Sequence, residues 1–89
     1  MKLSKHFLRH DVDGEVLLVS VGGTDFSGVV RGNKTLSALL ELLAGETTQA
    51  ELVAAMKRRF DAPEGAIERD VSRALDELRR IGALDELPA

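Results

Sequence analysis

The sequence of 89 residues predicts an α+β fold in which a three-stranded antiparallel sheet is followed by three helices. In the first third, short apolar runs are separated by turn residues such as Asp13-Gly14. From Asn33 onward, apolar residues recur instead with the period of about 3.6 that is typical of helices. The last helical pattern, residues 64–81, has a continuous apolar stripe that the other elements are expected to cover.

Three strands are expected, at about residues 5–12, 15–21 and 24–30. Asp13-Gly14 joins the first two strands in a tight hairpin, because both residue types tolerate a positive φ. Residues 16–19 are apolar on both faces, which favours a middle strand over an edge strand. Gly22-Gly23 marks the second turn, so the sequence predicts an antiparallel meander with a free outer edge.

Three helices are expected, at about residues 34–44, 49–60 and 64–81. Asn33 is a good N-cap for the first helix. Thr48 and Glu51 match a capping box at the start of the second helix. Pro63 suits the first turn of the third helix, and Gly82 suits the left-handed residue that ends it.

The long third helix is expected to organise the core. Its apolar stripe comprises Ile67, Val71, Ala74, Leu75, Leu78 and Ile81. Three strands followed by three helices describe one compact domain, residues 1–89, of winged-helix type, with the hairpin in the wing position moved to the N-terminus. The tail, residues 85–89, is expected to offer nothing to pack.

Composition excludes several classes of function. The chain has no cysteine, which rules out disulfides, thiolate nucleophiles and cysteine-ligated zinc or iron–sulfur sites. Its net charge is −3, and it has three Phe but no Trp or Tyr, so it lacks the basic and aromatic surface of most nucleic-acid binders. No apolar run approaches the ~20 residues that span a bilayer, and the first residues lack the apolar core of a signal peptide. A cytoplasmic location is expected.

The residues that most often carry catalysis are not arranged for it. His6 and His10, the only histidines, would lie about 13 Å apart on one strand, too far to share a metal ion. Ser20, Ser27, Ser37 and Ser72 fall within expected strands and helices rather than on a sharp turn beside a base. Gly22-Gly23 lacks the Lys-Ser/Thr of a phosphate-binding loop and indicates a turn. The sequence therefore predicts no enzyme activity, no metal and no cofactor.

Two functions that require no catalysis, DNA binding and a structural role, remain open. A winged-helix arrangement raises the question of DNA binding, for which a recognition helix should present basic and amide side chains. Residues 64–80 instead carry five acidic against four basic residues, and the helix dipole explains the basic run at residues 57–59. The second alternative is a structural or oligomerisation domain, because the free strand edge can pair with a second copy in a homodimer.

Several motifs, taken in order, resemble those of one known family. They are residues 13–19 (DGEVLLV), Asn33, residues 39–45 (LLELLAG), residues 48–52 (TQAEL) with Phe60, and Asp70-Val71 with Leu75, Leu78, Gly82 and Leu84. Over residues 7–84 this order and spacing resembles the family of coenzyme PQQ synthesis protein D (PqqD), also called RiPP precursor-peptide recognition elements. The chain departs from the family at Gly32-Asn33, where Leu-Asn is common.

The resemblance implies a non-catalytic module. Family members bind the leader segment of a ribosomally synthesised precursor peptide and present it to a modifying enzyme, often a radical SAM protein. Any iron–sulfur chemistry would belong to that partner, because this chain has no cysteine.

The physical mechanism expected for such binding is strand addition. An extended peptide would pair with the free edge of the third strand, and its side chains would enter the cleft beside the long helix. The expected peptide-binding residues are Asp25, Phe26, Ser27, Gly28, Val29 and Val30 on the strand, and Asp70, Arg73, Ala74 and Glu77 on the helix.

Overall fold

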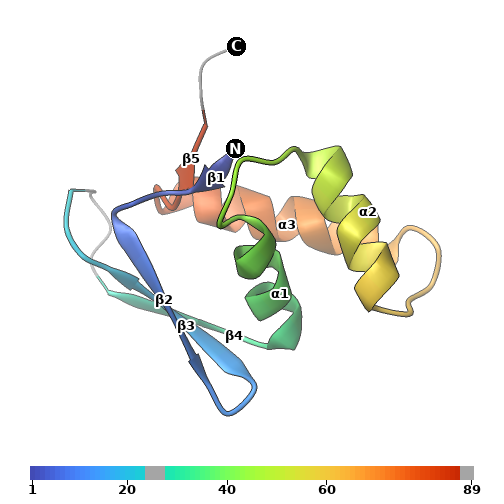
Figure 1. The fold of residues 1–89 in the computed structure, drawn as a ribbon, viewed down its shortest axis with the longest axis horizontal. Coiled ribbons are helices and arrows are strands. Elements are labelled where there is room, and N and C mark those ends of the chain that lie inside the picture. The colour runs from blue at the N-terminus through green and yellow to red at the C-terminus, as the bar shows by residue number, and fades with distance from the viewer. Residues whose placement is uncertain (24–27, 87–89) are drawn as a thin grey trace.

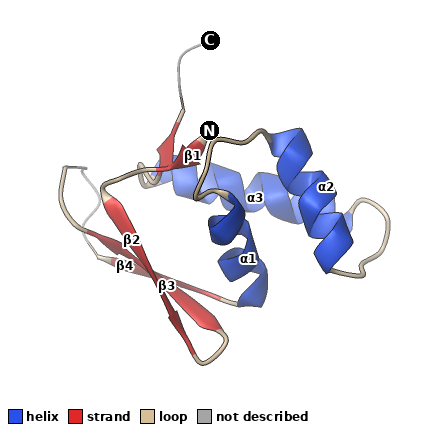
Figure 2. Cartoon of the chain, in the orientation of Figure 1, coloured by secondary structure: helices blue, strands red, loops and turns tan. Residues whose placement is uncertain are grey.

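The computed structural model describes residues 1–23 and 28–86. The elements are, in order, β1 (Lys2–Leu3), β2 (Phe7–Val12), β3 (Glu15–Ser20), β4 (Val29–Gly32), α1 (Lys34–Leu42), α2 (Gln49–Arg59), α3 (Ala66–Arg80) and β5 (Leu84–Asp85). Figure 1 shows β2, β3 and β4 together at the lower left, with the helices above and to the right. The predicted α+β class is confirmed: a three-stranded antiparallel sheet precedes three helices (Figure 2).

The sheet has the strand order β2-β3-β4, so β3 is the middle strand, as its apolar run predicts. The hairpin turn is at Asp13 and Gly14, both with a positive φ. Val16 and Leu18 of β3 are fully buried and face the helices. The alternate residues point to the outer face of the sheet, where Leu8 and Val29 are each more than half exposed.

All three strands of the meander differ in their boundaries from the sequence-based expectation, and the second, expected at residues 15–21, ends at Ser20. The first strand of the meander begins at Phe7 rather than at residue 5, because the Phe7 amide bonds back to the Ser4 carbonyl in a turn. The third was expected at residues 24–30; β4 is Val29–Gly32, and residues 24–27 lie outside the described residues. The strand therefore continues through Arg31 and Gly32, directly up to the cap of α1.

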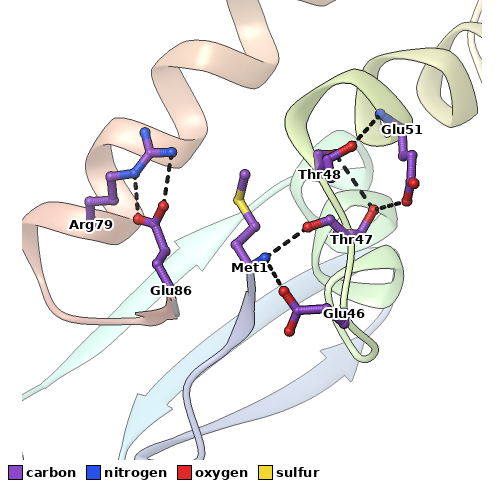
Figure 3. Close-up of polar contacts among 7 residues, drawn as sticks. All are labelled: Met1, Glu46, Thr47, Thr48, Glu51, Arg79 and Glu86. Atoms are coloured by element: carbon purple, nitrogen blue, oxygen red, sulfur yellow. Dashed lines mark hydrogen bonds and ion pairs between the residues drawn. The ribbon is translucent and has the colours of Figure 1, made fainter. Parts of the chain in front are cut away.

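The predicted caps of α1 and α2 are confirmed. The Asn33 side chain accepts hydrogen bonds from the Thr35 and Leu36 amides, at 3.1 and 3.2 Å. The Thr48 hydroxyl accepts one from the Glu51 amide at 3.2 Å (Figure 3). Helix α1 ends at Leu42, earlier than the predicted residue 44.

The long helix begins later than predicted. Expected to start at residue 64, α3 starts at Ala66, because the preceding Gly65 has a φ of 82° that no right-handed helix contains. Pro63 therefore belongs to the turn before the helix, where its carbonyl accepts a hydrogen bond from the Ala66 amide. The other end fits the expectation, since Gly82 just beyond the helix has a φ of 79°.

The expectation that the tail offers nothing to pack is wrong for Asp85 and Glu86, and residues 87–89 lie outside the described residues. Strand β5 pairs antiparallel with β1, which places Lys2 opposite Asp85. The N-terminal ammonium binds the carboxylate of Glu46 and, at 2.8 Å, the carbonyl of Thr47. Arg79 of α3 forms an ion pair with Glu86 at 2.6 Å, so the N-terminus is held by the loop between α1 and α2, and Glu86 is held by α3 (Figure 3).

The core lies between the helix-facing side of the sheet and the three helices. Its buried apolar residues are Phe7, Val16, Leu18, Ala38, Leu39, Leu40, Leu43, Leu52, Met56, Ile67, Val71, Leu75, Leu78, Ile81 and Ala83. All of the predicted α3 stripe is buried except Ala74, which is half-buried. Helix α3 is therefore covered on most of its apolar face, and Ala74 marks the part that remains open.

Exposed ion pairs fasten α2 to its neighbours. Arg59 binds Glu41 of α1 at 3.2 Å, and Lys57 binds Glu68 of α3 at 2.7 Å. These hydrogen bonds lower the pKa of the Glu41 and Glu68 carboxyls. Three basic residues lie at the C-terminal end of α2, and two of them, Lys57 and Arg59, are thus paired with carboxylates of the same chain.

Candidate functional site

A groove of about 820 Å³ lies between β4 and α3. All four residues of β4 line it, whereas its described lining includes no residue of β2 or β3. It therefore follows the edge of β4 that faces away from β3. Because β4 ends the sheet order, this edge has no strand partner among the described residues, and its backbone groups are open to an incoming strand.

The floor of the groove is apolar. It is formed by Leu36 and Leu39 of α1, Met56 of α2, Val71, Ala74 and Leu78 of α3, and Ile81 at the C-cap of α3. In Figure 1, α3 runs behind α1 and α2, and each of the three helices contributes residues to the lining of the groove. An apolar floor beside an open strand edge suits an extended peptide with apolar side chains.

The α3 wall has two rows of side chains. The inner row is apolar and consists of Val71, Ala74, Leu78 and Ile81. The outer row is charged and consists of Asp70, Arg73, Glu77 and Arg80. Both rows repeat at intervals of three and four residues, which keeps each on one side of the helix. A peptide in the groove would meet the apolar row with its buried side and the charged row at its rim.

Some of these charges already have partners. Arg80 binds Glu77 at 2.7 Å, and this hydrogen bond raises the pKa of Arg80. Arg31 of β4, which also lines the groove, lies 3.3 Å from Glu15. Within residues 1–23 and 28–86, Asp70 and Arg73 make no ion pair at all.

Six of the ten predicted site residues line this groove. They are Val29, Val30, Asp70, Arg73, Ala74 and Glu77. Gly28 adjoins β4 but does not line the groove, and Asp25, Phe26 and Ser27 lie outside the described residues. That any of the ten binds peptide stays a prediction.

Sequence reasoning missed several lining residues. Arg31 and Gly32 were missed because the third strand was placed too early, and Leu36 because its helical period marks it simply as core. Arg80 could have been found, because it continues the interval that joins Asp70, Arg73 and Glu77.

Gly32 of β4 lies directly beside Leu36 of α1. A Cβ atom at this position would lie 2.2 Å from Cδ2 and 2.8 Å from Cβ of Leu36. Leu36 therefore occupies the space that a side chain at position 32 would need, which explains the departure from the Leu-Asn pattern.

We expect Gly32→Ala to lower the free energy of unfolding by about 1–3 kcal/mol, because Leu36 must leave its position. Chemical denaturation measures the loss, and the double variant with Leu36→Ala should recover part of it. Gly45→Ala is the matched control, since no atom lies within 4 Å of the Cβ it would add. Unchanged stability for Gly32→Ala would show that Leu36 moves aside freely.

The described residues include neither a group of metal ligands nor a membrane-spanning helix. In the part of the chain that the structure describes, no three His, Cys, Asp or Glu side chains are grouped to hold a metal ion. Among the same residues, no helix is both long and apolar enough to cross a membrane.

The sequence matches a known family, and the fold is similar to that of a solved structure. A family model described as "Coenzyme PQQ synthesis protein D (PqqD)" matches residues 15–84. Among solved structures, the chain is similar to "TbiB1 in Complex with the TbiA(beta) Leader Peptide", with a TM-score of 0.81, 21% identity and full coverage of both chains. At that identity the likeness shows the fold alone. No curated protein matches the sequence significantly.

Proposed function

The chain belongs to the family of coenzyme PQQ synthesis protein D (PqqD), and on this premise we propose that it is a non-catalytic module that binds the leader segment of a ribosomally synthesised precursor peptide. One observation carries the proposal: the open edge of β4 runs beside an apolar groove of about 820 Å³. The similar fold of TbiB1, whose structure is described as a complex with a leader peptide, adds support.

The proposed mode of binding is addition of a strand to β4. Backbone N–H and C=O groups of the leader pair with those of Val29–Gly32, which gives affinity with little dependence on sequence. Every second side chain of the leader then points into the groove, towards the inner row of α3. The other strand edge is on β2, and no described residue of β2 lines this groove, so a peptide paired at that edge would not contact the inner row of α3.

The proposed binding residues fall into two groups. Val29 and Val30, with Arg31 and Gly32 added, supply the strand edge, and Asp70, Arg73, Ala74 and Glu77 supply the helix wall. Asp25, Phe26 and Ser27 lie outside the described residues, and Gly28 directly precedes β4; we keep these four residues in the proposal as contacts for the end of the leader.

The partner that completes the function is proposed to be a modifying enzyme of the radical SAM type, which carries the chemistry that this chain lacks. The module itself binds and positions the peptide. Side chains of the leader that do not enter the groove point to the outer face of the sheet, beside the exposed Val29 of β4. There they remain accessible to the enzyme.

An amide NMR titration with candidate leader peptides, one at a time, tests this function. We expect shifts at Val29–Gly32 and along the groove wall of α3, with Ala54 on the exposed face of α2 unchanged. Shifts confined to Phe7–Val12 would place the peptide on the wrong edge. A response to duplex DNA but to no leader would favour the DNA-binding alternative, and sedimentation of the free protein tests for a homodimer.

A further inference from the structure

We infer that the open edge of β2 binds a second copy of this chain, giving one continuous sheet with three strands from each copy. The inference goes beyond the proposed peptide-binding function, because it concerns the edge of the sheet opposite to β4. It comes from the order of the side chains along β2.

Strand β2 has an open backbone edge. It ends the strand order β2-β3-β4, and of the described elements only β3 packs extensively against it. The Val21 amide donates a hydrogen bond to the His6 carbonyl at 2.9 Å, so the alternation of an antiparallel ladder directs the even-numbered residues of β2 towards β3. The backbone groups of Arg9 and Asp11 therefore point to the side where no described strand lies, and they are available to an added strand.

The sequence of β2 is complementary to itself when two copies run antiparallel. Residues 8–12 read Leu-Arg-His-Asp-Val, with an apolar residue at each end and opposite charges on either side of a histidine. With His10 opposite His10 of the second copy, Arg9 lies opposite Asp11 and Leu8 lies opposite Val12. Because the backbone groups of Arg9 and Asp11 point to the edge, these two residues also exchange backbone hydrogen bonds in this register. Opposite charges that face each other across two strands stabilise the pairing.

The charges also select this register. The two neighbouring registers that keep edge-directed residues opposite each other place Arg9 opposite Arg9, or Asp11 opposite Asp11, and like charges in facing positions are unfavourable. Charged residues on an edge strand commonly prevent pairing with other chains. Here they prevent pairing in these two registers and permit it in the one centred on His10.

Pairing improves contacts that are incomplete in the single chain. Leu8 and Val12 are 55% and 49% exposed, and strand pairing places Leu8 of each copy against Val12 of the other, which removes apolar surface from water. Arg9 lies 3.5 Å from Asp11, two residues along its own strand, and Asp11 also accepts a hydrogen bond from Ser37 of α1 at 2.9 Å. Asp11 of the second copy is nearer to Arg9, because facing residues have Cβ atoms about 4.5–5.5 Å apart, against about 6.6 Å between alternate residues of one strand.

Pairing at β2 leaves the groove free. Strand β4 lies at the far side of each half of the joint sheet, and no described residue of β2 lines the groove. A dimer would therefore keep two separate grooves, one at each end of the joint sheet.

A cysteine cross-link tests the register. The chain has no cysteine, so a single introduced thiol can form a disulfide only with a second copy. His10→Cys places this thiol at the centre of the pairing, where the two Cα atoms lie about 4.5 Å apart, within the range of a disulfide. In the matched control Val12→Cys, the two thiols lie about 13 Å apart along the paired strands. We expect mild oxidation to give a covalent dimer of His10→Cys and none of Val12→Cys, and any other pattern would overturn the inference.

Charge reversal tests the pairing without a covalent bond. Arg9→Asp and Asp11→Arg each bring like charges into facing positions, so we expect either variant to dimerise about tenfold more weakly than wild type in a sedimentation-velocity concentration series. An equimolar mixture of the two should recover the dimer, because the acidic residues of one copy then face the arginines of the other. Recovery also shows that both variants fold. Arg69→Asp, which makes the same change of charge on the exposed face of α3, should dimerise like wild type.

The expected dimer is weak, because the edge of one short strand makes a small interface. We expect it to appear between about 10 µM and 1 mM protein. A wild-type chain that stays monomeric at about 1 mM, or a mixture that dimerises no better than its separate variants, would contradict the inference. These results do not depend on the leader titration, so this inference and the proposed function can fail separately.

Discussion

Replacing Leu78 by alanine should lower the free energy of unfolding by about 2–5 kcal/mol. Leu78 is only 2% exposed and belongs to the core between α3 and the other helices. Its truncation removes buried methyl groups and leaves a cavity that the rigid surrounding elements fill only in part. For a chain of 89 residues this is a large part of the total stability, so we expect a clear fall in the urea midpoint followed by far-UV circular dichroism.

Arg69→Ala provides the control on the same helix. Arg69 is exposed and makes no ion pair among the described residues, so its removal should change stability by no more than about 0.5 kcal/mol. If Leu78→Ala were as mild as this control, Leu78 would not be part of a close-packed core, and the described packing of α3 would be wrong.

Replacing Ala74 by arginine should have the opposite profile: binding is lost and folding is kept. Ala74 is half-buried in the groove wall, and a long charged side chain there would fill the space in which we propose that the leader binds. We expect affinity for a leader peptide to fall about thirtyfold or more, as for residues at the centre of an interface. The helix itself should tolerate the change, because arginine is nearly as good a helix former as alanine.

Fluorescence anisotropy with a labelled leader peptide measures the affinity, and denaturation measures the stability. Ala54→Arg is the matched control, since the same change on the exposed face of α2 should affect neither quantity. A loss of stability at Ala74→Arg equal to that at Leu78→Ala would instead place Ala74 in the core and remove it from the groove.

Local signals in the sequence were enough for most of the fold. The caps at Asn33 and Thr48 and the turn at Asp13-Gly14 depend on hydrogen bonds within a few residues, and all three were predicted correctly. The start of α3 was placed wrongly because Pro63 and Gly65 give conflicting signals, and the left-handed glycine prevailed.

Pairing between distant segments was harder to predict. Strand β5 has only two residues, too few for any periodic pattern, and its existence depends on β1 at the other end of the sequence. The end of β4 likewise depends on pairing with another strand, because Arg31 and Gly32 extend β4 by pairing with Leu17 and Val16 of β3.

The candidate site shows the same difference between features set by local sequence and features set by distant contacts. Helical periodicity alone placed Asp70, Arg73, Ala74 and Glu77 on one face, and that face does line the groove. It could not show that Leu36 fills the space above Gly32, because that contact is set by the angle at which α1 packs on β4. Nor could it show that Arg80 pairs with Glu77, or that Arg73 has no ion pair among the described residues.

The pairing of β1 with β5 has a consequence for the order of folding. The β2–β3 hairpin and the α2–α3 pair join segments close in sequence, so their loops close early and at small entropic cost. Lys2 and Asp85, by contrast, can meet only after nearly the whole chain between them is in place. The two-residue ladder should therefore form after the transition state, and substitutions in it should speed unfolding while leaving the folding rate unchanged.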